Sequence, residues 1–213
     1  MNVLITGGSR GIGRATALLA GERGWNVGVN YVSNEQAANA TVEAVQKAGG
    51  KAVKLKCDCS KEEEVQSMFE QMDAAFGPLI GVVINAGITA RSLPLAEFDT
   101  ERLRRVLDTN ILGAYLCARE ASRRLAQSDK DNRSIVFVSS VASKLGSPNE
   151  YVDYAGSKGA MDSLSIGLSK ELGPKHIRVN NVRPGMIKTD IHDHSGDPGR
   201  AERLGNLCPL GRA

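Results

Sequence analysis

Three glycines between a short apolar run and a helical pattern place the strongest constraint on how this chain folds. The apolar run at 3–5 leads into Thr-Gly-Gly-Ser-Arg-Gly-Ile-Gly at 6–13, and a helix is expected to follow. A turn this tight needs residues without Cβ. Gly7 reverses the chain, Gly11 lets a ligand reach the backbone, and Gly13 lets the helix lie close to the strand. The free N–H groups and the positive dipole at the helix start attract an anion, so the segment predicts a phosphate-binding loop.

Short apolar segments alternate with longer helical patterns along the rest of the chain. Such alternation is typical of βαβ units with a parallel sheet covered on both faces. We therefore predict a Rossmann-type, doubly wound α/β fold with three layers, formed by a single domain over residues 1–213. The expected strands are 2–6, 26–31, 52–57, 81–84, 133–138 and 177–182. The expected helices are 11–23, 34–48, 60–76, 100–126, 150–173 and 200–205.

Two of these helices carry stripes that are expected to face the core. The buried stripe of the first helix is expected to be Ile12, Ala15 and Leu19. The stripe of the long helix is Leu103, Leu107, Asn110, Ala114, Cys117 and Ala121. One member is polar, and a buried asparagine must be hydrogen-bonded. From its position alone, Asn110 is either a structural residue, which we favour, or a site residue.

The composition argues against several classes of protein. Of the 213 residues, 41% are hydrophobic and 24% are charged, as in ordinary soluble globular proteins. The apolar runs are too short to cross a bilayer, so we expect a cytoplasmic protein with no membrane partner. The 27 basic and 24 acidic residues are scattered, which argues against nucleic acid as a partner. The cysteines at 57, 59, 117 and 208 lack the spacing of a zinc site and are expected to be reduced.

His192, Asp193 and His194 raise the possibility of a metal site. Two histidines in a polar loop are more often exposed to solvent, and no further cluster of ligands accompanies them in the sequence. We therefore predict that the chain binds no metal.

Tyr154 and Lys158 are four residues apart on an expected helix, so their side chains share one face. A phenol with a pKa near ~10 is a poor acid or base at neutral pH, and a nearby ammonium group lowers that pKa. A tyrosine tuned in this way can give a proton to a carbonyl oxygen or take one from an alcohol. The spacing alone is weak, because tyrosine and lysine occur four apart on many solvated helices.

The order of motifs along the whole chain resembles the short-chain dehydrogenases/reductases. Besides the glycine loop, the resemblance rests on Asn85-Ala86-Gly87 after the fourth strand, Asn110, Ser139-Ser140 after the fifth strand, Tyr154 with Lys158, and Pro184-Gly185 after the sixth. Order and spacing agree over nearly the whole chain. The chain looks most like the compact single-domain branch, which includes 3-oxoacyl-carrier-protein reductases and glucose dehydrogenases. So many motifs in order identify a family but say little about the substrate.

The resemblance implies an oxidoreductase that transfers a hydride between nicotinamide and a carbonyl or alcohol substrate. Tyr154 would be the general acid/base, and Lys158 would lower its pKa and hold the nicotinamide ribose. Ser140 would hydrogen-bond the substrate oxygen, with Ser139 and Ser143 as the alternatives.

The same resemblance gives Asn110 a catalytic role. Asn110 would support a water chain that relays protons to Lys158, which replaces the structural interpretation favoured above. The alternative function is a non-catalytic dinucleotide-binding regulator or scaffold with the same fold.

The end of the second strand bears on the choice of cofactor. NAD-selective enzymes place a carboxylate there to bind the ribose 2′-hydroxyl, and it would repel a 2′-phosphate. Here the strand ends without an acid until Glu35, and Arg10 could bind the extra phosphate through paired hydrogen bonds. We therefore predict NADP (NADPH), with NAD less favoured. The loop motifs and the resemblance together imply these cofactor-binding residues: Gly7, Ser9, Arg10, Gly11, Ile12, Gly13, Asn30, Tyr31, Asp58, Cys59, Asn85, Ala86, Gly87, Tyr154, Lys158, Pro184, Gly185, Ile187 and Thr189.

The last residues bear on assembly. Family members usually continue beyond a segment like 209–212 with one more helix and strand, which form one of the surfaces used for tetramers. Either the sequence stops at the last ordered or expressed residue, which we favour, or the protein is a shortened one that lacks these elements. The other surface is formed by the helices expected at 100–126 and 150–173. Small residues from Gly156 to Gly167 suit close packing there, so we expect a homo-oligomer, a tetramer or a dimer. In the family, the segment containing His192 and His194 covers the substrate, so either histidine could contact it.

Overall fold

The computed structural model of the chain describes residues 1–191, 196–197 and 199–213. Its strands are β1 Asn2–Ile5, β2 Asn26–Tyr31, β3 Lys51–Lys56, β4 Gly81–Ile84, β5 Ser134–Val138 and β6 Arg178–Val182. The longer helices are α1 Gly11–Glu22, α2 Glu35–Lys47, α3 Glu62–Phe76, α4 Thr100–Leu107, α5 Gly113–Gln127 and α7 Val152–Leu172. The described chain also contains two short helices and two 3₁₀ turns: α6 Ala142–Leu145, α9 Arg200–Gly205, Leu95–Glu97 and Gly173–Lys175. The predicted alternation of strands and helices is confirmed.

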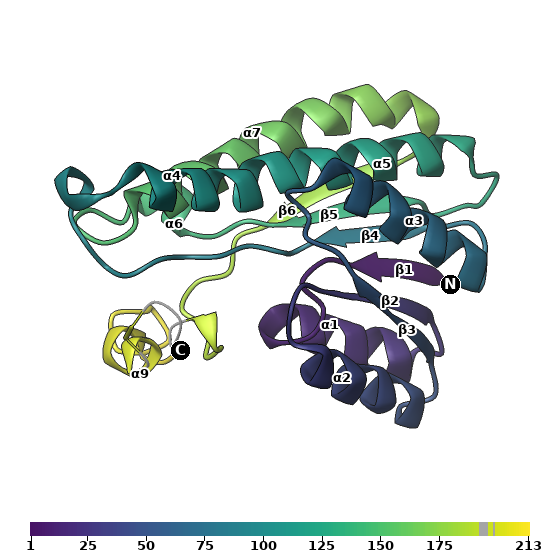
Figure 1. Cartoon of the computed structure of the whole chain (residues 1–213), viewed down its shortest axis with the longest axis horizontal. Helices are drawn as coiled ribbons and strands as arrows, with labels where there is room; N and C mark the ends of the chain where they lie inside the picture. The colour runs from purple at the N-terminus through teal and green to yellow at the C-terminus, as the bar shows by residue number, and fades with distance from the viewer. Residues whose placement is uncertain (192–195, 198) are drawn as a thin grey trace.

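All the strands of the sheet run parallel, in the order β3-β2-β1-β4-β5-β6. In this register Val3 lies opposite Val27 on one side and Gly81 on the other. After β3 the chain crosses back over β1 to start β4, so the connections leave β1 and β4 in opposite directions (Figure 1). Ligands of doubly wound folds bind beyond the carboxyl ends of strands at such a switch point.

Helices cover both faces of the sheet, which confirms the predicted three-layer fold (Figure 1). The layer of α1 and α2 encloses an apolar cluster with β1 and β2 that includes Val27, Val29 and Val45. The layer of α3, α5 and α7 encloses a larger cluster that includes Phe69 and Phe137. None of the helices in the described part of the chain is long and apolar enough to cross a membrane.

The long helix predicted at 100–126 is interrupted. A π-helical turn, Asp108–Leu112, separates α4 from α5. Such a turn adds a residue to the helix and shifts which positions face the core. Arg102 and Val106 are therefore buried on α4, whereas the predicted Leu107 is 40% exposed and Leu103 is half-buried. Beyond the turn, the predicted stripe through Ala114, Cys117 and Ala121 is buried.

The buried stripe predicted for α1 is wrong. The residues that face the core are Gly13, Ala17, Ala20 and Gly21, whereas Leu19 is 52% exposed. A Cβ added at Gly21 would lie 2.9 Å from the carbonyl oxygen of Val45 in α2. The helix therefore packs through its smallest residues, because close approach to the glycine loop and to α2 leaves no room for larger ones.

Candidate active site

The glycine loop between β1 and α1 occupies positions that exclude side chains. Gly7 and Gly11 have φ angles of +62° and +52°, a region that residues with Cβ rarely adopt. At Gly13, a Cβ would lie 2.3 Å from the Gly7 carbonyl oxygen and 2.6 Å from Nδ2 of Asn85. Arg10 precedes α1 without a side-chain cap hydrogen bond to it. The first N–H groups of α1 lie at this loop, where they could bind an anion.

Polar side chains from neighbouring strands hold this loop. Nδ2 of Asn85, after β4, donates to the carbonyl oxygens of Thr6 and Gly7 at 2.9 and 3.1 Å. Oγ1 of Thr6 in turn accepts the N–H groups of Asn85 and Ala86. Oδ1 of Asn30 accepts the N–H of Gly7 at 2.9 Å. Nδ2 of Asn30 donates to backbone carbonyl oxygens at the end of β3. The Asn30 side chain is thus buried and supports the loop from inside the protein.

Further residues predicted to meet a cofactor border the same loop. Arg10 is exposed at the start of α1. Thr189, after β6, lies on the other side, where its Cβ is 3.5 Å from the position of a Cβ on Gly11. The carbonyl oxygen of Ser9 accepts a hydrogen bond from a threonine of α2 at 3.2 Å, and Ile12 is half-buried in the first turn of α1. The segment that follows β6 therefore reaches the loop where the sequence predicts an anion.

Tyr154, on α7, meets the loop that follows β5. Its phenol hydrogen-bonds with the Ser140 hydroxyl. Burial raises the pKa of the phenol, and the hydrogen bond with Ser140 lowers it by less. The hydroxyl of Ser139 donates instead to the backbone of α7 at 3.0 Å, and that of Ser143 donates to an aspartate of α7 at 2.8 Å. Of the three candidate serines, Ser140 is the one that lies against the phenol.

Lys158 lies one turn after Tyr154 and is 3% exposed. Its Nζ donates to the carbonyl oxygen of Val138 at 2.8 Å and is 5.6 Å from the centroid of the Tyr154 ring. Burial lowers the pKa of Lys158 to about 8, although Asp162 acts in the opposite direction. The sequence analysis expects the ammonium of Lys158 to lower the pKa of Tyr154. In this geometry the phenol's pKa is raised, because burial dominates and the opposing group is Ser140.

The low pKa of Lys158 predicts a stability that rises with pH. Between roughly pH 8 and pH 10.5, the folded chain has released a proton that the unfolded chain still holds, so unfolding takes up a proton. Relative to Lys158→Met, we expect the free energy of unfolding of the ligand-free protein to increase by about 3 kcal/mol across this window. Urea unfolding of both proteins measures the difference, and comparison with the variant removes contributions from other groups. A difference that stays constant or falls with pH would contradict the prediction.

Asn110 lies in the π-helical turn and is fully buried. Its Oδ1 accepts the N–H of Ile88 at 2.8 Å, and its Nδ2 donates to the carbonyl oxygen of Ile88 at 2.9 Å and to Oγ of Ser157 at 3.0 Å. A Cβ on Gly87 would lie 3.4 Å from Oδ1 of Asn110 and 3.3 Å from Nζ of Lys158. Asn110 is therefore a satisfied buried residue that also borders the Lys158 ammonium.

Residues 1–198 match the family model of the short chain dehydrogenases. The chain belongs to the short-chain dehydrogenase family. Among the similar proteins, the uncharacterized oxidoreductase YgfF of Escherichia coli is 50% identical over 98% of this chain and 85% of its own length. A 2,5-dichloro-2,5-cyclohexadiene-1,4-diol dehydrogenase of Sphingobium indicum is 38% identical over 99% of this chain and 82% of its own length.

A solved short-chain dehydrogenase structure agrees with the fold. The crystal structure of the 3-ketoacyl-(acyl-carrier-protein) reductase of Brucella melitensis complexed with NADH matches with a TM-score of 0.89 and 25% identity, over 99% of this chain and 83% of that one. The resemblance drawn from the motifs is confirmed, and this chain is an oxidoreductase of the family. The family binds a nicotinamide dinucleotide. The glycine loop fits one, because Gly7 and Gly11 take φ angles above zero and the start of α1 packs so closely on the loop that no Cβ fits at Gly13.

Three of the predicted cofactor-binding residues lie at the ends of β2 and β3, two of them in a compact turn after β3. Oδ1 of Asp58 accepts the N–H and the hydroxyl of Ser60 at 3.0 and 2.8 Å. Cys59 is buried, with its Sγ 3.7 Å from Oδ1 of Asn30. Tyr31 ends β2 and is also buried. In this short-chain dehydrogenase the side chains of Cys59 and Tyr31 therefore lie inside the protein, and their predicted contact with a cofactor would involve their backbone.

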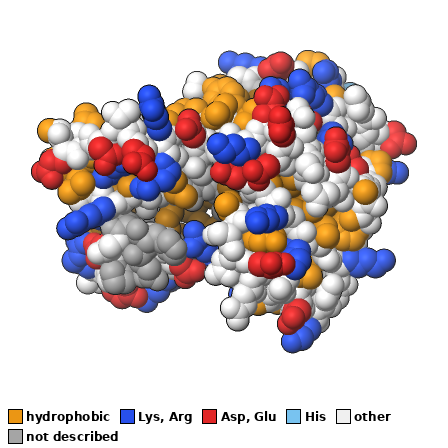
Figure 2. Space-filling view, viewed as in Figure 1, with side chains coloured by type: hydrophobic (Ala, Val, Ile, Leu, Met, Phe, Trp, Pro, Cys, Tyr) orange, Lys and Arg blue, Asp and Glu red, His pale blue; other side chains and the backbone are white. Residues whose placement is uncertain are grey.

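The last of the predicted cofactor-binding residues follow β6. The carbonyl oxygen of Pro184 accepts the N–H of Val141 at 3.1 Å, which joins this segment to the loop that carries Ser140. Gly185 has open space around the position of a Cβ, and Ile187 is 42% exposed. Figure 2 shows the surface hollowed between the part that carries α9 and the layer of α1 and α2. The structure does not describe His192, Asp193 and His194. Among the residues that it does describe, no group of acidic, histidine or cysteine side chains could hold a metal ion.

An ion pair that the sequence analysis missed supports this site. Nε of Arg102 donates to Oδ2 of Asp153 at 2.9 Å, and both side chains are buried. Oδ1 of Asp153 accepts the backbone N–H of Tyr154 at 2.9 Å. Nη1 of Arg102 donates to the carbonyl oxygen of Arg91 at 2.6 Å. The pair therefore connects α4, the first turn of α7 and the loop after β4. In the sequence, Arg102 looks like an ordinary surface cation, so its ion pair with Asp153 becomes visible only in the folded structure.

Asp162 is a second residue that sequence reasoning missed. It is 5% exposed and lies one turn after Lys158 on α7. Burial would raise its pKa, but hydrogen bonds from Arg183, Ser143 and Asn181 lower it to about 2. Asp162 is therefore ionised and ties α7 to the ends of β5 and β6. Its place four residues after Lys158 is the signal that could have indicated it.

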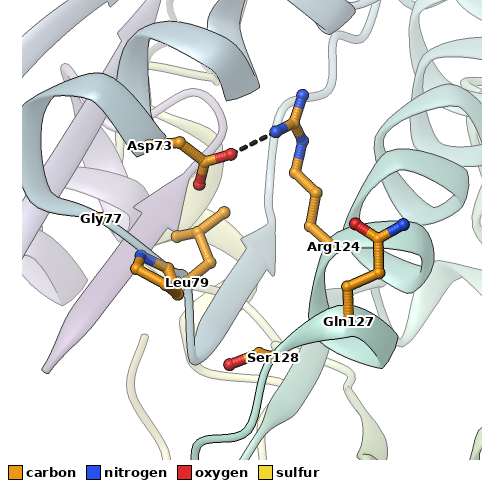
Figure 3. A pocket seen from close by; sticks show the side chains of 7 residues that line it. Asp73, Gly77, Leu79, Arg124, Gln127 and Ser128 are labelled. Atoms are coloured by element: carbon orange, nitrogen blue, oxygen red, sulfur yellow. Dashed lines mark hydrogen bonds and ion pairs between the residues drawn. The ribbon is translucent and has the colours of Figure 1, made fainter.

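A cleft of about 370 Å³ lies away from this site, where α3 and α5 end and β4 begins. Figure 3 shows Asp73 and Arg124 paired across it, with Leu79 and Ser128 beside them. It lies at the amino edge of the parallel sheet, whereas Ser140 and the glycine loop are at the carboxyl edge. This cleft therefore takes no part in the candidate active site.

Proposed function

We propose that this protein is an NADP-dependent oxidoreductase that interconverts a carbonyl compound and its alcohol, with Tyr154 as the general acid/base. The observation that carries the proposal is the position of the Tyr154 phenol beside Ser140, with buried Lys158 one turn away and its Nζ 5.6 Å from the centroid of the Tyr154 ring. When bound, nicotinamide supplies or accepts the hydride. A chain that kept only a dinucleotide-binding role would need none of these side chains at one place.

The proton chemistry falls to the chain's own residues. Tyr154 gives its phenolic proton to the carbonyl oxygen in reduction, or takes the hydroxyl proton in oxidation. Ser140 hydrogen-bonds that same oxygen and lowers the pKa of the phenol. Lys158 contributes a positive charge below pH ~8 and holds the nicotinamide ribose. Asn110 fixes the backbone at Ile88 close to Lys158. Purified protein mixed with NADPH and a panel of ketones should consume NADPH, and the absence of turnover on every ketone would contradict the proposal.

The preference for NADP rests on the charges around the end of β2. No carboxylate follows Tyr31 until Glu35, and Glu35 is paired with Lys54 at 2.5 Å. Arg10 is the exposed cation of the glycine loop. A guanidinium binds a phosphate through two parallel hydrogen bonds, which favours a dinucleotide with a 2′-phosphate. The Brucella reductase was crystallised with NADH, so family membership alone does not decide the cofactor.

Removing the Arg10 side chain should therefore weaken NADPH binding selectively. In Arg10→Ala we expect the Kd for NADPH to rise about tenfold or more, because one charge-assisted contact with the phosphate is lost. The Kd for NADH should change little. Arg14→Ala, which removes an exposed cation of the same helix, is the matched control and should change neither Kd. Calorimetric titration of the three proteins with both dinucleotides measures this. NADH affinity equal to or above NADPH affinity in the wild type would refute the cofactor assignment.

We also propose that the protein forms a homo-oligomer through α4, α5 and α7. The small residues predicted for an interface, Gly156, Ser163 and Gly167, are exposed on α7, and open space surrounds both glycines. Exposed apolar side chains lie on the same helices: Leu107, Leu112, Tyr115 and Ile166. Burial of such a surface favours a dimer or a tetramer. Light scattering that gives the mass of one chain would refute it.

A further inference from the structure

Two buried hydroxyl groups beside the candidate active site have no hydrogen-bond partner. Within the described part of the chain, Oη of Tyr151 and Oγ1 of Thr89 are buried and unpartnered. The other buried unpartnered atoms are Nε of Arg119, Arg124 and Arg133 and Oδ1 of Asn181, and each of these side chains is hydrogen-bonded through another atom. A tyrosine or threonine has a single polar side-chain atom. These two side chains therefore make no hydrogen bond to the protein within the residues that the structure describes.

Leaving a buried hydroxyl unpaired destabilises a folded protein, since the group has lost its water and gained nothing in return. Such groups persist where a ligand supplies the missing partner. Tyr151 is 5% exposed, so its phenol cannot recover the loss by contact with bulk water. The pair of orphaned hydroxyls is thus an independent indication of a ligand, apart from any motif.

Both hydroxyls belong to segments that are fixed against the catalytic groups. Thr89 follows Ile88, whose N–H and carbonyl oxygen are both bound by Asn110. Tyr151 lies directly before α7 and one turn before Tyr154. Further hydrogen bonds join the two segments. The N–H of Leu93 donates to the carbonyl oxygen of Glu150 at 3.2 Å. The guanidinium of Arg102 donates to the carbonyl oxygens of Arg91 and Glu150.

A third segment holds the Tyr151 ring in place. Cζ of Arg200, at the start of α9, lies 5.0 Å from the centroid of the ring. Both terminal nitrogens of Arg200 are paired with the Glu150 carboxylate, at 2.6 and 2.5 Å. This pairing lowers the pKa of Glu150, so the carboxylate remains ionised and neutralises the guanidinium. A carboxylate on the ligand would repel Glu150 and compete with it for Arg200, whereas a neutral oxygen would do neither.

From these observations we propose that Tyr151 and Thr89 bind a second, neutral oxygen of the substrate, close to the carbon that Tyr154 serves. The preferred substrates are then hydroxyketones, diketones or diols rather than simple ketones or keto acids. This inference rests on the proposed function and adds the substrate class to it. A phenol can both donate and accept, so it suits a hydroxyl or a carbonyl oxygen equally.

A pair of ketones that differ by one hydroxyl group tests the inference. The probes are acetoin and butanone, with NADPH, and kcat/KM is measured for each in the wild type, Tyr151→Phe and Thr89→Val. We expect the ratio of kcat/KM for acetoin to that for butanone to fall about tenfold or more in Tyr151→Phe, and by a smaller factor in Thr89→Val. Ser67→Ala removes an exposed hydroxyl of α3 and is the control, in which the ratio should not change.

A stability measurement keeps the test independent of turnover. Because the Tyr151 hydroxyl has no partner, Tyr151→Phe should melt at or above the wild-type midpoint without ligand, whereas a structural tyrosine would melt lower. An unchanged ratio of kcat/KM, with activity present, overturns the inference and leaves the proposed function intact. Failure to oxidise NADPH with either ketone counts against the proposed function. The melting comparison then decides, and a lower midpoint for Tyr151→Phe overturns the inference.

Discussion

Tyr154→Phe is expected to lower turnover of carbonyl substrates by roughly 10²- to 10⁴-fold, the usual contribution of a positioned general acid. The substitution removes one hydroxyl and keeps the ring. Ser140 retains its other hydrogen bond, in which its Oγ accepts the N–H of Ala142 at 3.1 Å, so the loop after β5 should keep its shape. Loss of rate would then reflect loss of the proton donor. The measurement is the rate of NADPH oxidation with the best ketone of a panel.

Two controls separate chemistry from folding in this experiment. Ser67→Ala, which removes an exposed hydroxyl of α3, should leave the rate unchanged. The Kd of Tyr154→Phe for NADPH should stay within about threefold of the wild-type value, because the glycine loop predicted to bind the phosphates lies on another element and the substitution removes only one of the predicted contacts. Turnover in Tyr154→Phe equal to wild type would remove the acid/base role. Lost binding together with lost turnover would indicate a structural effect instead.

The sequence was sufficient to predict what depends on local backbone rules. Glycines with φ above zero and a glycine with no room for Cβ have few alternatives, so Gly7, Gly11 and Gly13 could be predicted as a loop. The alternation of strands and helices then placed the loop, Ser140 and Gly185 at one edge of a parallel sheet, where the structure has them. A regular pattern carries such predictions because every residue in it supports the same geometry.

The errors occurred where tertiary packing overrides a regular period. The stripe of α4 was misplaced because the π-helical turn at Asp108–Leu112 adds a residue that no periodicity announces. On α1, an exposed leucine was taken as core, although glycine and alanine face the sheet. The relation between Lys158 and Tyr154 was also misjudged, because spacing on a helix does not reveal that Nζ is held by the carbonyl oxygen of Val138.

Long-range polar contacts were the other omission. Arg102 and Asp153 are 51 residues apart, and the sequence shows each as an ordinary charged residue of a helix. The orphaned hydroxyls of Tyr151 and Thr89 are likewise visible only once their surroundings are known. Such features report on what surrounds a side chain in space, and one sequence without its fold contains no local pattern for them.

Gly13→Ala is the second substitution with a large expected effect, because its consequence follows from distance alone. The new Cβ would be 2.3 Å from the Gly7 carbonyl oxygen and 2.6 Å from Nδ2 of Asn85. That same nitrogen donates to the Gly7 carbonyl at 3.1 Å, so neither atom can move without losing this hydrogen bond. We expect a loss of about 2 to 4 kcal/mol in the free energy of unfolding, as in strongly overpacked sites. We also expect a Kd for NADPH raised about tenfold or more, because the loop and the start of α1 would separate.

Gly21→Ala is the matched control, since Gly21 lies on the same helix but faces α2 rather than the loop. Its Cβ would be 2.9 Å from the carbonyl oxygen of Val45, so the variant should lose some stability yet bind NADPH with unchanged affinity. Urea unfolding and calorimetric titration of both variants therefore separate the two roles of small residues on α1, helix packing and the phosphate cradle. If both variants lost stability equally and both kept their affinity for NADPH, the cradle would not depend on Gly13. The anion would then have to bind at a site other than the start of α1.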